Sequence, residues 1–205
     1  MRTGLAMLIV LISLMLIVIT VGSVINGQTI DGTTTEEDYN QIIEETIDEI
    51  TGYIMIKDQK GKYDVINGEA RIDKVALWIK PLISKDLTLS EITIQLDDGE
   101  NVKLLKYDND SEDIQSKSLF EHFIWDNMTG ENFGFISIVD IDSSIIEYDI
   151  INDCSDNAYL VFRLPEDMTL AKYEKITVTI IPSTGLKRVI ELEAPFSIKP
   201  IVTFE

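Results

Sequence analysis

The sequence has little cysteine, histidine or positive charge. Its 205 residues include one cysteine, Cys154, and one histidine, His122, which excludes an intrachain disulfide and zinc sites that need several such ligands. We expect Cys154 to be half-buried as a small apolar residue. The 17 basic residues are outnumbered by 36 acidic ones, for a net charge of −19. Because an acidic surface repels phosphate, we expect no nucleic-acid partner.

The sequence also lacks the short motifs of the common enzyme families. It contains no dinucleotide-binding or Walker glycine loop, no H-E-x-x-H zinc motif and no G-x-S-x-G nucleophile elbow. Ser118, Glu121 and His122 lie close together along the chain, but a catalytic triad is defined by its geometry. We therefore expect that the protein is not an enzyme, with no catalytic residue and no required cofactor.

Charge is absent from a long stretch near the N-terminus. No Asp, Glu, Lys or Arg lies between Arg2 and Asp31. The run Leu5–Ile25 is almost entirely apolar, and as a helix it would be about 30 Å long, enough to cross a hydrocarbon core. The run has no polar stripe, so a helix over residues 1–30 must be surrounded by lipid or by protein on every side.

Three interpretations of this run remain open: a secretory signal peptide, a plain membrane anchor, or a polymerisation helix. A polymerisation helix would lie in the membrane before assembly and in a filament core afterwards. We favour it because one small domain cannot surround such a helix, whereas copies of the same helix can. The predicted polymerisation core consists of Leu5, Leu8, Ile9, Leu11, Ile12, Met15, Leu16 and Ile19.

Residues 31–50 carry eight acidic residues and no basic one. Apolar residues recur at helical spacing from Tyr39 to Ile54, which predicts an amphipathic helix over residues 35–52. We therefore divide the chain into an N-terminal helical polymerisation or membrane segment, residues 1–54, and an outer domain, residues 55–205.

The outer domain shows a period of two. Apolar residues alternate in Val75–Ile79, Ile92–Leu96, Leu160–Leu164, Ile176–Ile180 and Ile190–Leu192, and glycine-containing turn signals separate several of these runs. The pattern predicts an immunoglobulin-like antiparallel β-sandwich, and an α+β fold for the whole chain. Residues 108–132 are polar and predict a long loop or a short helix near residues 118–125.

Two N-x-[ST] sequons lie in this polar region, at Asn109 and Asn127. An acceptor asparagine must be exposed, so both are candidate glycosylation sites if the chain is exported.

Two groups of carboxylates could hold a hard cation such as calcium through oxygen ligands. One is the pair Asp140 and Asp142, and the other is the set Asp108, Asp110 and Asp113. Neither matches the calcium loop of an EF-hand, so no residue is assigned as a metal ligand.

Both ends of the chain resemble the archaellins, the subunits of the archaeal swimming filament. Thr3-Gly4-Leu5 followed by Ile9–Ile12 is similar to the start of a mature archaellin. Residues 180–185, the extended stretch that follows to Ala194-Pro195, and residues 198–204 are similar to the last strands of the family. Residues 74–81 followed by residues 87–96 resemble its early strands. The apolar run is richer in Leu and Ile than is usual in the family, and residues 107–158 match no known pattern.

The resemblance implies a structural filament subunit whose apolar helices form the core and whose sandwiches form the outer wall. It implies a membrane-inserted precursor cut by a prepilin-type peptidase, with Met1 as the mature N-terminus, and an extracellular filament of one or several archaellins. The alternative is a membrane-anchored binding module, such as an archaeal adhesion pilin or an archaellar accessory protein.

Overall fold

The computed structural model describes residues 54–84, 86–114, 118–183, 186–196 and 199–204. Two predicted helices, over residues 1–30 and 35–52, lie outside these ranges and stay predictions. The predicted division of the chain at residue 54 lies at their edge and also stays a prediction. The strands are β1 (Ile54–Ile66), β2 (Glu69–Pro81), β3 (Leu87–Thr88), β4 (Thr93–Asp97), β5 (Val102–Asp113), β6 (Asn132–Val139), β7 (Ile150–Ile151), β8 (Asn157–Arg163), β9 (Lys175–Ile181), β10 (Arg188–Glu193) and β11 (Ile201–Thr203). The helices are the 3₁₀ turns η1 (Leu89–Glu91), η2 (Leu119–Glu121) and η3 (Glu166–Met168) and the short α-helices α3 (Ile124–Asn127) and α4 (Ser144–Tyr148).

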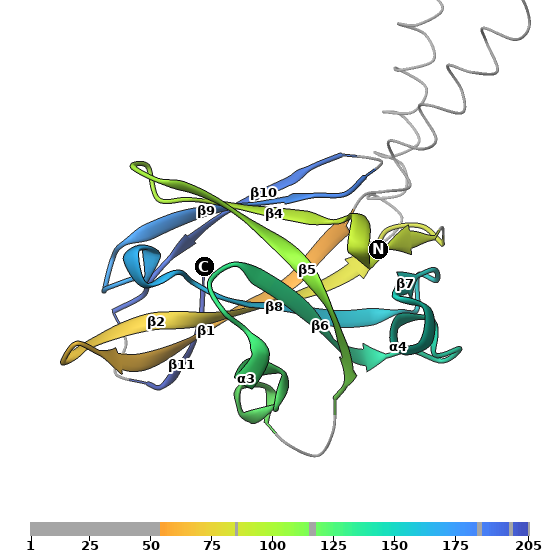
Figure 1. Ribbon diagram of the computed structural model, residues 1–205, viewed down its shortest axis with the longest axis horizontal. Coiled ribbons are helices and arrows are strands. Elements are labelled where there is room, and N and C mark those ends of the chain that lie inside the picture. The colour runs from red at the N-terminus through yellow and green to blue at the C-terminus, as the bar shows by residue number, and fades with distance from the viewer. Residues whose placement is uncertain (1–53, 85, 115–117, 184–185, 197–198, 205) are drawn as a thin grey trace, which may run out of the picture. The chain divides into compact units, whose positions relative to one another are not determined.

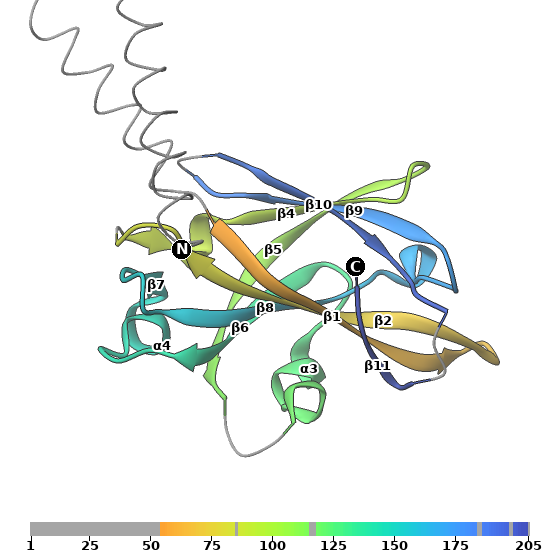
Figure 2. The same cartoon turned by 180° about the vertical axis from the view of Figure 1, so that it is seen from behind.

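Nine of these strands form one sheet in the order β10-β9-β4-β5-β6-β8-β2-β1-β11, and β3 pairs with β7 in a second, two-stranded sheet. The large sheet curls over itself, so that β10, β9 and β4 face β1, β2 and β8, while the long strand β5 connects the two layers (Figures 1 and 2). The apolar core lies between these layers.

The alternating runs found in the sequence build this core. Val75, Leu77 and Ile79 on β2 are at most 1% exposed, and Ile94 on β4 and Val178 on β9 are fully buried. Successive side chains of a strand point to opposite faces, so a period of two places every second residue inside. The β-rich outer domain predicted from the sequence is confirmed.

A second, smaller core covers the outer face of β2, β6 and β8. Phe120, Ile124 and Trp125 from the segment 118–128 are buried against Ala76 of β2 and Val161 of β8. The predicted short helix near residues 118–125 is present as η2 and α3, and it acts as a cap over the sheet.

The structure differs in two respects from the predicted immunoglobulin-like antiparallel β-sandwich. The large sheet is continuous, and β5 and β6 run parallel to each other. The parallel pair arises because the chain between them crosses over through η2 and α3 and returns in the same direction, which a tight hairpin cannot do.

Two local expectations are also wrong. Asp108–Asp113 belongs to β5 and not to a loop, because the strand continues past a register shift between Tyr107 and Ser111 and pairs with β6 on the far side. Cys154 is exposed, because it lies in the turn before β8, where its backbone N–H donates to Ser84 Oγ at 3.1 Å.

Candidate functional site

The residues predicted to form the polymerisation core, Leu5 to Ile19, lie outside the described residues. In the part of the chain that the structure describes, no helix is both long and apolar enough to cross a membrane. The candidate sites described below therefore all lie on the outer domain.

The two sequons, far apart along the chain, lie side by side on the outer domain. Asn109 and Asn127 are both exposed. Asn109 has a left-handed backbone, with φ of 52°, at the register shift in β5. Asn127, at the end of α3, donates from Nδ2 to Oδ2 of Asp110, the middle residue of the other sequon, at 3.2 Å. The structure thus brings the two predicted acceptors to one surface.

The hydroxyl groups of both sequons are engaged in the fold. Ser111 Oγ donates to Asp149 Oδ1 at 2.7 Å, and the Tyr107 hydroxyl donates to the same oxygen. Burial and the hydrogen bond to Asp149 raise the pKa of Tyr107, which therefore stays protonated as a donor. Thr129 Oγ1 lies 2.9 Å from Asn132 Oδ1. These contacts hold β5 and the start of β6 in place around the sequons.

One group of carboxylates comes together in the described residues: Asp140, Asp142 and Asp156, whose ligand oxygens all lie within 4.8 Å of one another. The sequence indicated the first two and missed Asp156, which is separated from them by α4 and β7 and is only 1% exposed. The other predicted set did not assemble: Asp108 accepts from Asn132 and Asp110 from Asn127 along β5.

Backbone N–H groups orient this carboxylate cluster. Asp140 Oδ2 accepts from the N–H groups of Ile145 and Ile146 at 3.1 and 3.3 Å, and Asp156 Oδ2 accepts from those of Asn152 and Asp153, both at 3.0 Å. Asp140 Oδ1 is buried without a hydrogen-bond partner among the described residues.

The two ends of the cluster differ electrostatically. Burial raises the pKa of the Asp140 carboxyl, whereas hydrogen bonds, first of all from Asn152, lower the pKa of the exposed Asp142. Asp142, at the exposed side, therefore ionises more readily than Asp140 and can present a negative oxygen to a cation.

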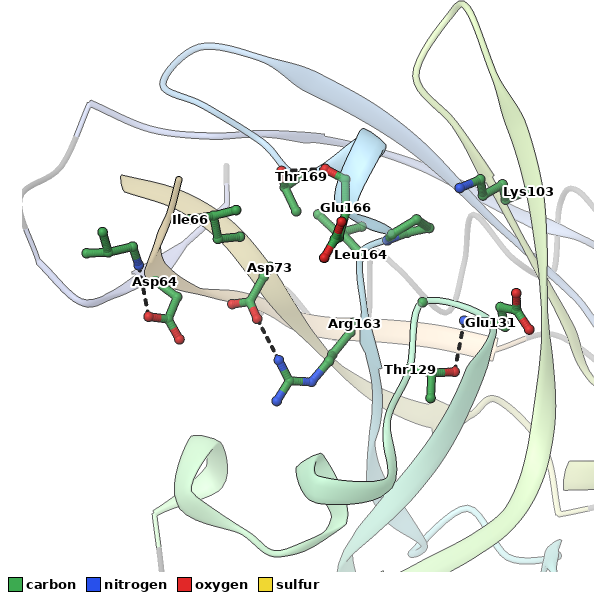
Figure 3. A pocket seen from close by; sticks show the side chains of 13 residues that line it. Asp64, Ile66, Asp73, Lys103, Thr129, Glu131, Arg163, Leu164, Glu166 and Thr169 are labelled. Atoms are coloured by element: carbon green, nitrogen blue, oxygen red, sulfur yellow. Dashed lines mark hydrogen bonds and ion pairs between the residues drawn. The ribbon is translucent and has the colours of Figure 1, made fainter. Parts of the chain in front are cut away.

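A cleft with a volume of about 720 Å³ opens beside the β1–β2 turn (Figure 3). Its floor holds the ion pair between Asp73 Oδ2 and Arg163 Nη1 at 2.9 Å. Asp73 is 7% exposed, and burial raises the pKa of its carboxyl against the opposing effect of Arg163. The lining also includes three further carboxylates, Asp64, Glu131 and Glu166, against one further cation, Lys103, so the cleft carries a net negative charge.

The histidine of the sequence is structural. His122 is 3% exposed; its Nδ1 accepts from the Ile124 N–H at 3.3 Å, and its Nε2 lies 3.1 Å from the Asp113 carbonyl oxygen. With both ring nitrogens engaged by the backbone, His122 connects the cap segment to β5 and takes no part in a triad with Ser118 and Glu121.

Similarity to known proteins identifies the family of this chain. The sequence profile of the archaeal-type flagellins matches residues 2–192, nearly the whole chain. The chain belongs to the archaeal-type flagellin family. That family consists of structural filament proteins and is not an enzyme family.

Two solved structures share the fold of this flagellin. The crystal structure of archaeal flagellin FlaB1 from Methanocaldococcus jannaschii matches with a TM-score of 0.63 and 20% identity, over 74% of this chain and 95% of that one. The archaeal flagellum of Methanospirillum hungatei strain JF1 matches with a TM-score of 0.53 and 13% identity, over 98% of this chain and 99% of that one. No curated protein matches the sequence.

Proposed function

We propose that this flagellin is a structural subunit of the archaeal swimming filament, the archaellum, and polymerises through its apolar N-terminal helix. The observation that carries the proposal is the family match, which begins at residue 2 and so includes the apolar run as well as most of the outer domain. The likeness to a flagellin subunit and to an archaeal flagellum supports it at the level of the fold.

The physical chemistry of the run leads to the same conclusion. A helix that is apolar on every side, attached to a domain of about 150 residues, is satisfied by like helices from other copies. Head-to-tail contacts that do not close into a ring generate an open helical polymer. The outer domain then forms the filament wall, and a motor at the base turns the filament.

The proposal extends to the life cycle of the subunit. Before assembly the helix lies in the membrane, where a prepilin-type peptidase processes the precursor. After assembly the chain is extracellular, in a filament of this flagellin alone or of several flagellins. The alternative, a membrane-anchored binding module, has no specific observation in its favour.

The test is to shear cells, collect the released filaments and identify their subunits by electron microscopy and peptide mass spectrometry. A filament subunit is recovered as the main protein of the sheared fraction, in many copies. An anchored module is instead retained in the membrane fraction, and that distribution would refute the proposal.

Glycan is proposed at Asn109 or Asn127, on the support of their exposure and their shared surface. The measurement is the intact mass of native subunits, compared with Asn109→Gln and Asn127→Gln variants. A native mass equal to that of the bare polypeptide would rule out modification of either asparagine.

A calcium-like ion is proposed at Asp140, Asp142 and Asp156. The support is the donor set itself, three carboxylates with one buried oxygen that lacks a partner, since hard cations prefer oxygen ligands. Calcium should raise the Tm of detergent-solubilised subunits, and a chelator should reverse the rise. Asp156→Asn should lose the response, whereas the exposed Asp126→Asn should keep it; equal responses would refute the site.

A further inference from the structure

Three positively charged side chains lie in one row across β1, β2 and β8. Lys62 pairs with Lys74, and Lys74 pairs with Arg163, in the register of the sheet. Residues paired across strands share a face, and adjacent strands lie about 4.8 Å apart. These three residues, called here the cationic row, lie on the outer face, because Lys74 and Arg163 both contact Trp125 of the cap.

The cationic row is only partly neutralised within the described part of the chain. Arg163 pairs with Asp73, whereas Lys62 and Lys74 have neither a hydrogen bond nor an ion pair there. Lys74 is 8% exposed, and its Nζ lies 5.4 Å from the centre of the Trp125 ring. Burial and the like charges of Arg163 and Lys62 lower the pKa of Lys74, against the weaker attraction of Asp73 and Asp64.

This arrangement is unusual for so acidic a chain. Like charges placed opposite each other on paired strands destabilise a sheet, and a buried ammonium without a carboxylate is costly. Among the described residues neither lysine forms an ion pair, although Asp73 and Asp64 attract Lys74. An anionic group from outside the domain would remove both costs.

Resting on the proposed filament function, we propose that the cationic row binds the acidic segment 31–50 of a neighbouring copy of this chain. That segment carries eight carboxylates and no positive charge, so its charge is complementary to the row. It follows the apolar run directly, so a polymer built on residues 5–25 keeps it close to other copies.

The spacing of the charges also matches. In the helix predicted over residues 35–52, Glu44 and Asp48, and likewise Glu45 and Glu49, stand four residues apart. Such pairs lie about 5–6 Å apart on a helix, close to the spacing of neighbouring strands. A helix crossing β1 can therefore place one carboxylate opposite Lys62, the less buried of the two lysines, and direct the next one towards Lys74, which lies beside Trp125.

The direct test is zero-length carbodiimide cross-linking of wild-type filaments, which joins an amine to a carboxylate only when they touch. The proposal predicts a dimer-sized product in which a peptide containing Lys62 or Lys74 is linked to one from residues 31–50. Linkage of these lysines only to carboxylates elsewhere, or only within a monomer, would overturn it. If the chain forms no filaments at all, the proposed function fails instead.

A charge-reversal pair of variants tests the energetic role. Lys62→Glu should lose most of the filaments per cell, whereas Lys106→Glu, an exposed lysine on β5, should keep them. Both chains should accumulate in cells to equal amounts. Normal filaments from Lys62→Glu chains would overturn the proposal, as would equal losses from both variants.

Discussion

Lys74 and its neighbour Asp73 are both more than nine-tenths buried, but their surroundings differ. Asp73 has Arg163 as an ion-pair partner, whereas Lys74 has mainly an aromatic ring and two like charges. Removing one partner of a buried ion pair is costly, whereas replacing a buried, unpaired charge by an apolar group of similar size is favourable. The two positions should therefore respond differently to neutral substitution.

We predict that Lys74→Met stabilises the isolated subunit by about 1 kcal/mol. The lowered pKa of Lys74 means that the unfolded chain binds this proton more tightly, so wild-type stability rises as the pH climbs through that pKa towards 10.5. The variant should lack this part of the rise. The measurement is the Tm of both proteins in detergent from pH 7 to pH 11.

The control is Lys106→Met, which is exposed on β5. Its Tm should follow the wild-type curve at every pH. If Lys74→Met lowers the Tm at pH 7, the ammonium is stabilised by its surroundings, and the account of an unpaired buried charge is wrong. Fewer filaments from a more stable Lys74→Met subunit would fit the proposed contact with a neighbouring copy.

At the scale of elements, the short strand β11 attaches the C-terminal end of the chain to the sheet. It pairs with β1 at Gly61, and the Phe204 N–H donates to the Gln59 carbonyl oxygen at 2.9 Å. Phe204 is 5% exposed, and a Cβ at Gly61 would lie 2.7 Å from its ring. Because Gly61 has no side chain, the Phe204 ring has room to pack in the core.

We predict that Phe204→Ala destabilises the subunit by about 3 kcal/mol, because it leaves a cavity in the core. Phe196→Ala is the matched control, since Phe196 is 68% exposed and should cost less than about 1 kcal/mol. Denaturant unfolding of both variants in detergent measures the difference. Equal costs would mean that β11 contributes no more to the core than an exposed aromatic residue does.

At the scale of the whole molecule, the chain combines an uncharged N-terminal run with a strongly acidic remainder. The run must be surrounded by lipid or by other apolar helices. Copies of the acidic outer domain, in contrast, repel one another at low ionic strength. Under the proposed function, the apolar run drives assembly, and contacts between outer domains depend on local pairing of opposite charges.

We predict that Leu11→Asp abolishes filaments, because a dry, unpaired carboxylate in the core costs several kcal/mol in every copy. Leu11→Met, which keeps volume and apolarity, should assemble normally. Electron microscopy of complemented, filament-deficient cells provides the measurement, with immunoblots to check expression. Normal filaments from Leu11→Asp chains would contradict the assignment of residues 5–19 to the polymerisation core.

The sequence by itself determined the elements whose cause is local. Alternation identified the core-facing residues of β2, β4, β8, β9 and β10, because the period of a strand is set by its backbone. Asn67-Gly68, a residue pair that favours hairpin turns, forms the β1–β2 turn, where both residues have positive φ, of 53° and 85°. The uncharged run beyond Arg2 indicated a polymerising subunit. That inference is also local, because the run is recognised from its own residues alone.

Only the tertiary structure decided what distant residues do together. Three features depend on the path of the chain in space: the parallel pairing of β5 with β6, the capping of the sheet by α3, and the proximity of Asp156 to Asp140. The cationic row has the same origin: Lys62, Lys74 and Arg163 carry no motif, and strand register alone makes them neighbours. Register depends on the packing of the whole sheet, so a periodic pattern specifies which face a residue occupies but not its neighbour across the strand.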